Sequence, residues 1–423
     1  MKRSLSPDRL PSARPVRAYA HPPYLNPAHP RRLAGEHRAL VRGTSALGHE
    51  VHLAFGPIYG PEGSMLERVE KFRTSDGRGI TTHVVPSLVR EINPLHDWRC
   101  YGQLRRLIAE LKPDIVHTHS SKAGIVGRGA AWAELKRGGG GGQSKLGVVH
   151  TIHGPPFYDG QNRLVRGMYI ASEKWAAKRC HLIVSVADAM TKKYLAEEIG
   201  RPEQYRTVYS GMEVERYSQV DSDGSMRRAA RREAGLGDGD FVIGTVARLA
   251  DQKGHDDLLD ALGGELKQRP NWKLLWVGDG WLRERLYKRI DAMGLRKQVV
   301  TTGLVPSERV PFFIRAMDVL AHPSYREGLP RTVPQALLGG VCPVAYDVDG
   351  TGEACIEGVT GKLVQLGDRD ALRSAIVWLF EQPSERAKMA ERGRAMCIDR
   401  FSTQRMVDDL EKVYAEAIAA ARA

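Results

Sequence analysis

The chain has few cysteines, 5 in 423 residues, and no two of them form a C-x-x-C pair. Scattered cysteines argue against a disulfide framework or a structural zinc site and predict reduced thiols in a cytoplasm. The sequence has no apolar run near the ~18–20 residues that a membrane span requires. It also lacks a G-x-G-x-x-G motif after the first predicted strand, at 16–20, which disfavours a nicotinamide-dependent oxidoreductase.

The first half of the chain is short of acidic residues. Residues 1–210 hold 32 Lys and Arg against 18 Asp and Glu, whereas residues 211–423 hold 31 against 32. A basic half favours an anionic partner such as a membrane surface, nucleic acid or a phosphorylated acceptor, although solvated surface charge gives the same count. Residues 1–17 are rich in Arg, Pro and Ser without an apolar centre, so we expect a disordered basic tail rather than a secretory signal.

A chain of 423 residues is too long for one hydrophobic core, so two domains are expected. Short apolar runs alternate with amphipathic segments, which predicts an α/β fold with parallel, doubly wound sheets. The predicted strands lie at 16–20, 51–54, 115–117, 146–152, 181–186, 208–210, 241–246, 273–277, 299–302, 318–322, 342–346 and 362–364, and helices are predicted at 98–111, 164–177 and 401–421.

The stretch at 318–338 combines a buried strand, a turn carrying Glu327 and a helix whose start is bracketed by Pro330 and Pro334. A helix that begins at the carboxyl end of a parallel strand directs unpaired N–H groups and its positive dipole end outward, which suits a phosphate. Glu327 at that position could accept hydrogen bonds from sugar hydroxyls. An ordinary strand–turn–helix with a surface glutamate explains the pattern equally well.

Two cations, Arg248 and Lys253, follow the predicted strand at 241–246. Fixed cations in a strand–helix loop can neutralise a diphosphate, Arg with a forked set of donors and Lys with a compact charge. The alternative is a solvated pair of loop residues. His153 also ends a strand, on a turn stiffened by two prolines, where it serves either as a site residue or as a satisfied capping group.

Other motifs receive a structural explanation. His117 and His119 have metal-like i, i+2 spacing, but no third ligand is near them in sequence, so we expect no metal. The glycine run at 138–142 is expected to be a surface loop, because it lacks the context of a phosphate loop. Four D-x-D triplets lie in polar turns where Asp is common; they begin at Asp221, Asp238, Asp347 and Asp368.

Taken together, the Pro323-Ser324 to Gln335 stretch, Arg248, Lys253-Gly254 and His153-Gly154 resemble the signature of the retaining glycosyltransferases of family 4. Two features depart from that signature. The second acid of the usual pair is Gln335, which can bind a hydroxyl only without charge assistance. The segment 21–35 contains no Gly-Gly pair, although such a loop usually approaches the donor phosphates in this family.

The resemblance implies the GT-B architecture, in which two facing Rossmann-like domains enclose an interdomain cleft. We expect an acceptor domain at 18–212, a nucleotide-sugar donor domain at 213–400, and a helix at 401–423 that crosses back to the first domain. The implied reaction moves a sugar from a nucleotide-diphosphate donor to a hydroxyl acceptor with retained configuration, without a metal ion or a cofactor other than the donor. A lipid-linked acceptor and an anionic membrane are the expected partners, and nucleic acid is not.

By the same resemblance, Arg248 and Lys253 would stabilise the leaving diphosphate. Glu327 would hold the donor sugar, and His153 would position or polarise it from the opposite wall. Gln335 is the expected ribose contact. The remaining expected substrate contacts are Gly303 and Val305 near the base, His119 at the end of its strand, and Gly328, Leu329, Pro330, Arg331, Thr332 and Val333 at the helix start.

Two further functions fit the same residues. An epimerase that acts on a nucleotide sugar would share the architecture but would need no acceptor. A non-catalytic protein that binds nucleotide sugars would explain Gln335 and the missing Gly-Gly loop.

Overall fold

The computed structural model describes residues 16–21, 43, 45, 47–57, 69–74, 77–89, 91–138, 146–158, 160–219 and 221–422. Most of the predicted tail, the segment expected to replace the Gly-Gly loop, and the glycine run after residue 138 lie outside these residues. Among the helices that the structure describes, none is both long enough and apolar enough to cross a bilayer.

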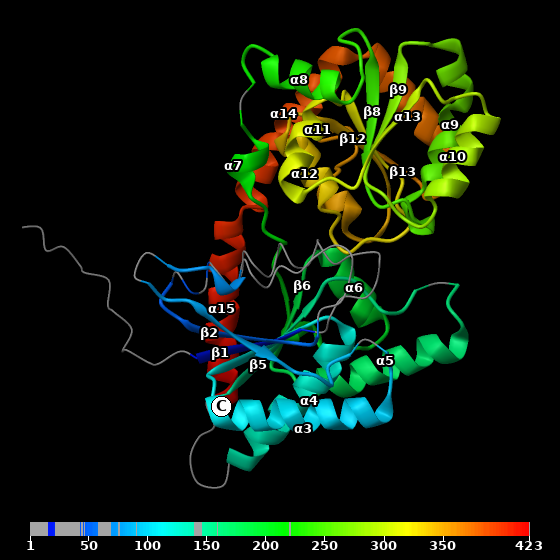
Figure 1. Cartoon of the computed structure of the whole chain (residues 1–423). Coiled ribbons are helices and arrows are strands. Elements are labelled where there is room, and N and C mark those ends of the chain that lie inside the picture. The colour runs from blue at the N-terminus through cyan, green and yellow to red at the C-terminus, as the bar shows by residue number, and fades with distance from the viewer. Residues whose placement is uncertain are drawn as a thin grey trace, which may run out of the picture.

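The described residues form two parallel β-sheets, one in each half of the chain (Figure 1). The first sheet has seven strands in the order β3-β2-β1-β4-β5-β6-β7. Its strands are β1 Val16–His21, β2 Glu50–Phe55, β3 Ile80–Val84, β4 Ile115–His119, β5 Gly147–Ile152, β6 Leu182–Ser185 and β7 Tyr205–Thr207. The strand order reverses between β1 and β4, as in a doubly wound sheet.

The second sheet has six strands in the described chain, in the order β10-β9-β8-β11-β12-β13. Its strands are β8 Phe241–Val246, β9 Trp272–Val277, β10 Val299–Gly303, β11 Val319–His322, β12 Cys342–Tyr346 and β13 Lys362–Val364. Here the order reverses between β8 and β11, so each half repeats the same winding. The predicted α/β class with two parallel sheets is confirmed.

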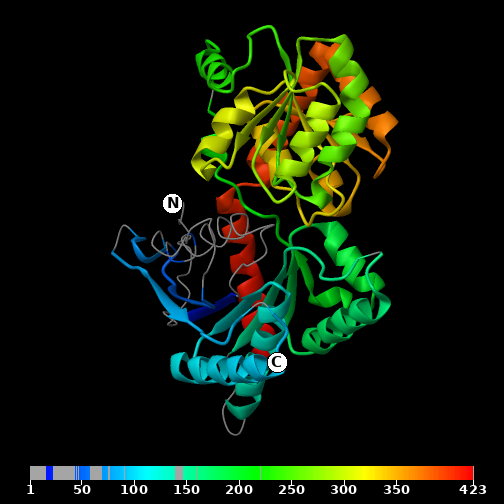
Figure 2. The same ribbon diagram turned by 45° about the vertical axis from the view of Figure 1, so that its right-hand side comes forward.

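Thirteen helices are described between and beyond these strands. They are α3 Pro94–Leu111, α4 Ser121–Gly138, α5 Arg163–Ala177, α6 Asp188–Ala196, α7 Val214–Tyr217, α8 Ser225–Glu233, α9 His255–Gln268, α10 Arg283–Ala292, α11 Val310–Arg315, α12 Thr332–Leu338, α13 Arg369–Glu381, α14 Pro383–Arg400 and α15 Thr403–Arg422. In the first half α4 packs between α3 and α5 (Figure 2).

The strands predicted at 241–246, 342–346 and 362–364 are confirmed at both ends. The strand predicted at 208–210 is wrong, because the pairing with β6 ends at Thr207. β3 was not predicted, since its residues Ile80–Val84 include two threonines and a histidine and give a weak apolar signal. The strand predicted at 16–20 begins where β1 begins, at Val16, and ends one residue before it.

The last helix, α15, returns to the first half of the chain (Figure 1). Its buried Met406, Leu410 and Val413 belong to the same core cluster as Ile115 of β4 and Val149 of β5. A second cluster crosses the junction between the halves, because it contains Val186 and Met190 from the first and Leu329 and Val333 from the second. The two sheets are therefore joined by continuous apolar packing as well as by the chain.

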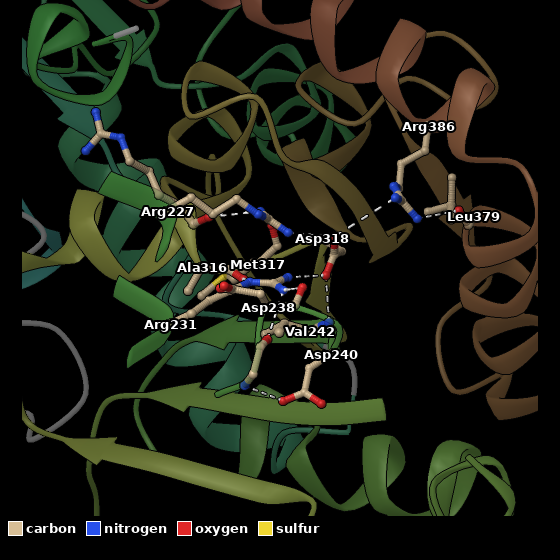
Figure 3. Close-up of polar contacts among 12 residues, drawn as sticks. Arg227, Arg231, Asp238, Asp240, Val242, Ala316, Met317, Asp318, Leu379 and Arg386 are labelled. Atoms are coloured by element: carbon tan, nitrogen blue, oxygen red, sulfur yellow. Dashed lines mark hydrogen bonds and ion pairs between the residues drawn. The ribbon is translucent and has the colours of Figure 1, made fainter. Parts of the chain in front are cut away.

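Asp318, immediately before β11, anchors the second sheet from its amino end (Figure 3). Its carboxylate accepts hydrogen bonds from Arg227 Nη2 at 2.7 Å, from Arg231 Nη2 at 2.8 Å and from the backbone N–H of Val242 at 2.8 Å. Burial lowers the pKa of Arg231, whose side chain is 3% exposed. The network holds α8 and the strand that carries the Glu327 turn together.

We expect Asp318→Ala to lower the free energy of unfolding by about 3–5 kcal/mol, because it leaves the buried Arg231 without its counter-charge. Denaturant unfolding measures the change. Asp291→Ala is the matched control: Asp291 is 59% exposed and lies 3.9 Å from Arg296, so its loss should cost under about 0.5 kcal/mol. Equal losses in the two variants would show that the Asp318 network contributes no special stability.

Candidate active site

The carboxyl ends of the two sheets meet at two glycines. A Cβ placed on Gly328, in the turn after β11, would lie 2.0 Å from the carbonyl oxygen of His153, which follows β5. A Cβ on Gly350, after β12, would lie 2.6 Å from the Cβ of Ala187, which follows β6. Any larger residue would force these turns apart. Ligand contacts in open α/β sheets come from this end of the strands, so the junction is the candidate site.

A buried ion pair lies at the centre of the junction. Lys253 Nζ donates to Glu327 Oε1 at 2.5 Å, and the two side chains are 3% and 2% exposed. His322 Nε2 lies 3.2 Å from the same oxygen, and its Nδ1 is 3.1 Å from Thr332 Oγ1. The structure therefore brings together Lys253 and Glu327, which the sequence predicted for one site, and adds His322, which the sequence analysis missed.

Asp349 holds the backbone of Glu327 and was also missed. Its Oδ2 accepts the N–H of Glu327 at 2.9 Å, while its Oδ1 accepts from Lys193 Nζ of α6 at 3.0 Å. Asp349 has a φ of 47°, a left-handed conformation that Asp tolerates better than most residues. The sequence assigned its D-x-D motif to an ordinary turn; its position just after a strand was the available signal.

Glu353 makes a second link across the junction. Its carboxylate accepts the backbone N–H groups of Asp188 and Ala189, both at 2.9 Å. These N–H groups begin α6, whose own N-cap, Ala187, has no side chain that can accept them. An acid at this end also interacts favourably with the helix dipole. Helix α6 is thus attached to the second half at its first turn and again at Lys193.

Arg248 lies on the same loop as Lys253, beside the turn that follows β9. Its Cζ is 5.8 Å from the ring centre of Trp281, and a Cβ on Gly280 would lie 2.7 Å from Arg248 Cγ. At the other end of the loop, a Cβ on Gly254 would lie 2.1 Å from the carbonyl oxygen of Pro323. The loop is therefore held between the β9 turn and the Glu327 turn.

The predicted contacts at the helix start divide into two kinds. Leu329 and Val333 are buried in the core cluster that crosses the junction, so only their backbone can face a ligand. Gln335 is partly exposed on α12. Helix α12 has 7 residues, and Pro334 removes one of its early N–H groups, so it offers fewer amides than expected. Of the other predicted contacts, Pro330 is buried, and Arg331 is partly exposed at the N-cap of α12.

The predicted base contacts lie beside the Arg248 loop. Gly303 ends β10 with a φ of 67° and forms an isolated bridge to Gly278, in the β9 turn. Val305 follows two residues later and is partly exposed. The turns after β9 and β10 are therefore neighbours at the same edge of the sheet.

On the side of the junction formed by the first sheet, His119 and His153 pair with each other. His119 Nδ1 lies 3.0 Å from His153 Nε2, and the rings stack with centroids 5.3 Å apart. Four residues beyond the His153-Gly154 turn, Tyr158 carries the Arg326 guanidinium over its ring at 3.9 Å. Arg326 directly precedes Glu327, so the histidine loop and the Glu327 turn touch at a further point.

The two halves of the chain match two known sequence families. Residues 38–216 match the family described as "Glycosyltransferase Family 4", and residues 226–396 match "Glycosyl transferases group 1". The predicted resemblance is confirmed over both halves.

Curated relatives align with most of the chain. An Escherichia coli enzyme named UDP-Gal:alpha-D-GlcNAc-diphosphoundecaprenol alpha-1,3-galactosyltransferase is 27% identical over 341 residues, 79% of this chain and 83% of that protein. The capsular polysaccharide biosynthesis glycosyltransferase CapM of Staphylococcus aureus is 24% identical over 353 residues, 81% of this chain and 88% of CapM.

Among solved structures, HepE of Anabaena in complex with UDP superposes with a TM-score of 0.76 at 19% identity, over 94% of this chain and 99% of HepE. This likeness concerns the fold, and it confirms the predicted GT-B architecture of two Rossmann-like halves.

We expect the two bonds of Asp349 to differ in their contribution to stability. Lys193→Met should cost less than about 1 kcal/mol, because Lys193 is 32% exposed. Asp349→Gly should cost about 1–3 kcal/mol, since the N–H of Glu327 loses its acceptor in the turn; glycine accepts the positive φ without strain. Denaturant unfolding compares the variants.

Asp349→Asn is the matched control, because it removes the charge but keeps an oxygen for the N–H of Glu327. It should resemble Lys193→Met. An Asn variant as unstable as the Gly variant would contradict the importance of the backbone hydrogen bond.

Proposed function

This chain belongs to the group 1, family 4 glycosyltransferases, which use nucleotide sugars, and on that premise we propose a retaining, metal-independent transfer. A hexosyl group would pass from a nucleotide-diphosphate donor to a hydroxyl acceptor. The observation that carries the proposal is the buried Lys253–Glu327 pair at the facing ends of the two sheets. By the family resemblance, these two charged side chains lie where the nucleotide-sugar donor would bind.

The donor domain supplies the charge that the leaving diphosphate requires. An ammonium group has three N–H donors, so Lys253 can keep its bond to Glu327 while another N–H binds a phosphate oxygen. Arg248, on the same loop, adds a forked set of donors. Cations fixed before the reaction stabilise charge as it develops, which favours the transition state over the bound donor. Transfer then needs no metal ion.

The sugar would lie between Glu327 and His153. Glu327 is held by Lys253, by His322 and through its own N–H by Asp349, so its carboxylate is oriented before a sugar hydroxyl arrives. His153 approaches from the first sheet and would position or polarise the sugar. In a retaining transfer of this kind the leaving phosphate itself can take the acceptor proton, so we assign no general base to the protein.

The remaining donor contacts are proposed around this centre. The backbone of Gly328, Leu329, Pro330, Arg331, Thr332 and Val333 would approach the phosphates. Gln335 would bind the ribose through a neutral hydrogen bond. The partly exposed Gly303 and Val305, beside the Arg248 loop, would pack against the base.

We also propose the domain division 18–212, 213–400 and 401–423, with the first unit binding the acceptor. The two sheets and the return of α15 to the first sheet support it.

We propose a lipid-linked acceptor in polysaccharide or glycolipid synthesis, reached at an anionic membrane surface. The E. coli relative is named for a diphosphoundecaprenol acceptor, and CapM for capsular polysaccharide. The first half is basic and exposes large apolar side chains on its helices; Trp98 of α3 is 73% exposed and Leu164 of α5 is 85% exposed. Apolar side chains beside cations suit the interface of an anionic bilayer.

Loss of Arg248 tests the transfer reaction. We expect Arg248→Ala to lower kcat on the order of 100-fold with a nucleotide-sugar donor panel, because it removes a donor to the leaving diphosphate. Release of nucleoside diphosphate measures turnover. Arg283→Ala is the matched control, since Arg283 lies near the same turn but binds Asp279 at 3.0 Å and is 53% exposed.

Chromatographic analysis of the products of the same reactions separates the competing functions. Turnover in the absence of any acceptor, with isomerised donor as product, would identify an epimerase. Donor binding without turnover across a broad acceptor panel would identify a non-catalytic binder.

Vesicle sedimentation tests the membrane contact. We expect the protein to sediment with anionic vesicles at low salt, and Leu164→Ser to weaken this binding several-fold, because it removes exposed apolar area. Leu366→Ser, on an equally apolar but second-half residue that is 47% exposed, should bind as the wild type does. Absence of sedimentation at low salt would contradict a peripheral membrane contact.

A further inference from the structure

A buried row of polar side chains leads from α15 to the candidate active site. Tyr414 on α15 has its hydroxyl 2.7 Å from His117 Nδ1, and His117 Nε2 is 2.6 Å from Thr151 Oγ1. Tyr414 is 1% exposed and His117 is fully buried. Both ring nitrogens of His117 thus have a partner, and its ring is fixed from two sides.

The row continues through ring contacts to His153. The rings of His117 and His119 have centroids 4.2 Å apart, and His119 is 2% exposed. His119 Nδ1 then pairs with His153 Nε2 at 3.0 Å. The row, which we call the histidine column, therefore consists of four packed side chains from α15, β4 and the turn after β5: Tyr414, His117, His119 and His153.

We propose that His119 is a positioning residue for His153, and that Tyr414 and His117 hold His119 in place. The proposal rests on the proposed transferase function, in which His153 contacts the donor sugar. It changes the role expected from the sequence, where His119 was placed among the substrate contacts.

The chemistry of two paired imidazoles supports this role. A hydrogen bond between two ring nitrogens needs the proton on one of them, so the bond links the protonation of the two rings. Two imidazolium cations at 3.0 Å would repel each other, so the doubly charged state is disfavoured. His153 Nε2 is committed to His119, which leaves Nδ1 as the ring nitrogen that does not contact His119.

Loss of His119 should affect the orientation of the His153 ring more than it affects binding of the donor. His119 is 2% exposed and pairs with His153, so its loss should change the orientation of the His153 ring without removing a substrate contact. A displacement of about 1 Å in a reacting group can cost on the order of 100-fold in rate. Donor binding, which depends on Arg248, Lys253 and Glu327 in the other half, should change little.

The test compares His119→Leu with His119→Asn. We expect His119→Leu to lower kcat on the order of 100-fold while the donor KM stays within about two-fold. Asn keeps a hydrogen-bonding group near the position of Nδ1, so His119→Asn should recover most of the rate. Tyr414→Phe should lower kcat only several-fold, because His117 keeps Thr151.

His181→Leu controls for general loss of packing. His181 accepts the N–H of Val148 at 2.9 Å through Nδ1 at the amino end of the first sheet, away from the candidate site. Its removal should lower thermal stability without lowering kcat. Equal kcat in His119→Leu and His181→Leu would overturn the proposal, and so would a raised donor KM at unchanged kcat, which would mark His119 as a direct contact.

The outcome for His153→Ala separates this proposal from the proposed function. If His153→Ala is inactive and His119→Leu is fully active, the positioning role fails and the transferase assignment stands. If His153→Ala keeps full turnover, the role of His153 fails and the positioning role fails with it. The Arg248→Ala assay tests the transferase assignment independently of both.

Discussion

The buried ion pair between Lys253 and Glu327 is the interaction on which the junction depends. Two charges removed from water are stable only with close geometry and further hydrogen bonds. The structure supplies the close geometry, with Lys253 Nζ 2.5 Å from Glu327 Oε1 and His322 Nε2 3.2 Å from the same oxygen, and Asp349 accepts the backbone N–H of Glu327. Two side chains approach one carboxylate oxygen of Glu327, and Asp349 fixes its backbone, so the carboxylate is oriented before a ligand arrives. This rigidity is what an electrostatic site requires.

The first half of the chain also helps to hold the turn that carries Glu327. Lys193 reaches Asp349, Glu353 caps α6, and Gly328 lies against the carbonyl of His153. The position of Glu327 is therefore coupled to the placement of the two sheets relative to each other. A change in the angle between the halves would alter the Glu327 turn and the His153 loop together, which are the two walls proposed for the sugar.

The Glu327 turn and the His153 loop are each supported by a buried polar network that lies outside the candidate site. On one side, Asp318 and its arginines fix the amino end of β11, whose carboxyl end carries the Glu327 turn. On the other side, the column from Tyr414 to His119 supports His153 and makes α15 part of the first half. Each network joins segments that are distant in sequence, so the charged and hydrogen-bonding groups at the junction rest on rigid elements rather than on loops alone.

The sequence by itself determined the α/β class, the ends of β8, β12 and β13, and the placement of Arg248, Lys253, Glu327 and His153 at strand ends. These features follow from short-range periodicity and turn chemistry. The edge strand β3 has few apolar residues, so the periodicity did not predict it.

Only the tertiary structure decided which of these side chains meet. Lys253 and Glu327 are 74 residues apart, and Lys193 and Asp349 are 156 apart. Such contacts depend on the order of strands in each sheet and on how the two sheets face each other. The periodicity of a single chain carries no information about either, so His322, Asp349 and the pairing of His119 with His153 became visible only in three dimensions.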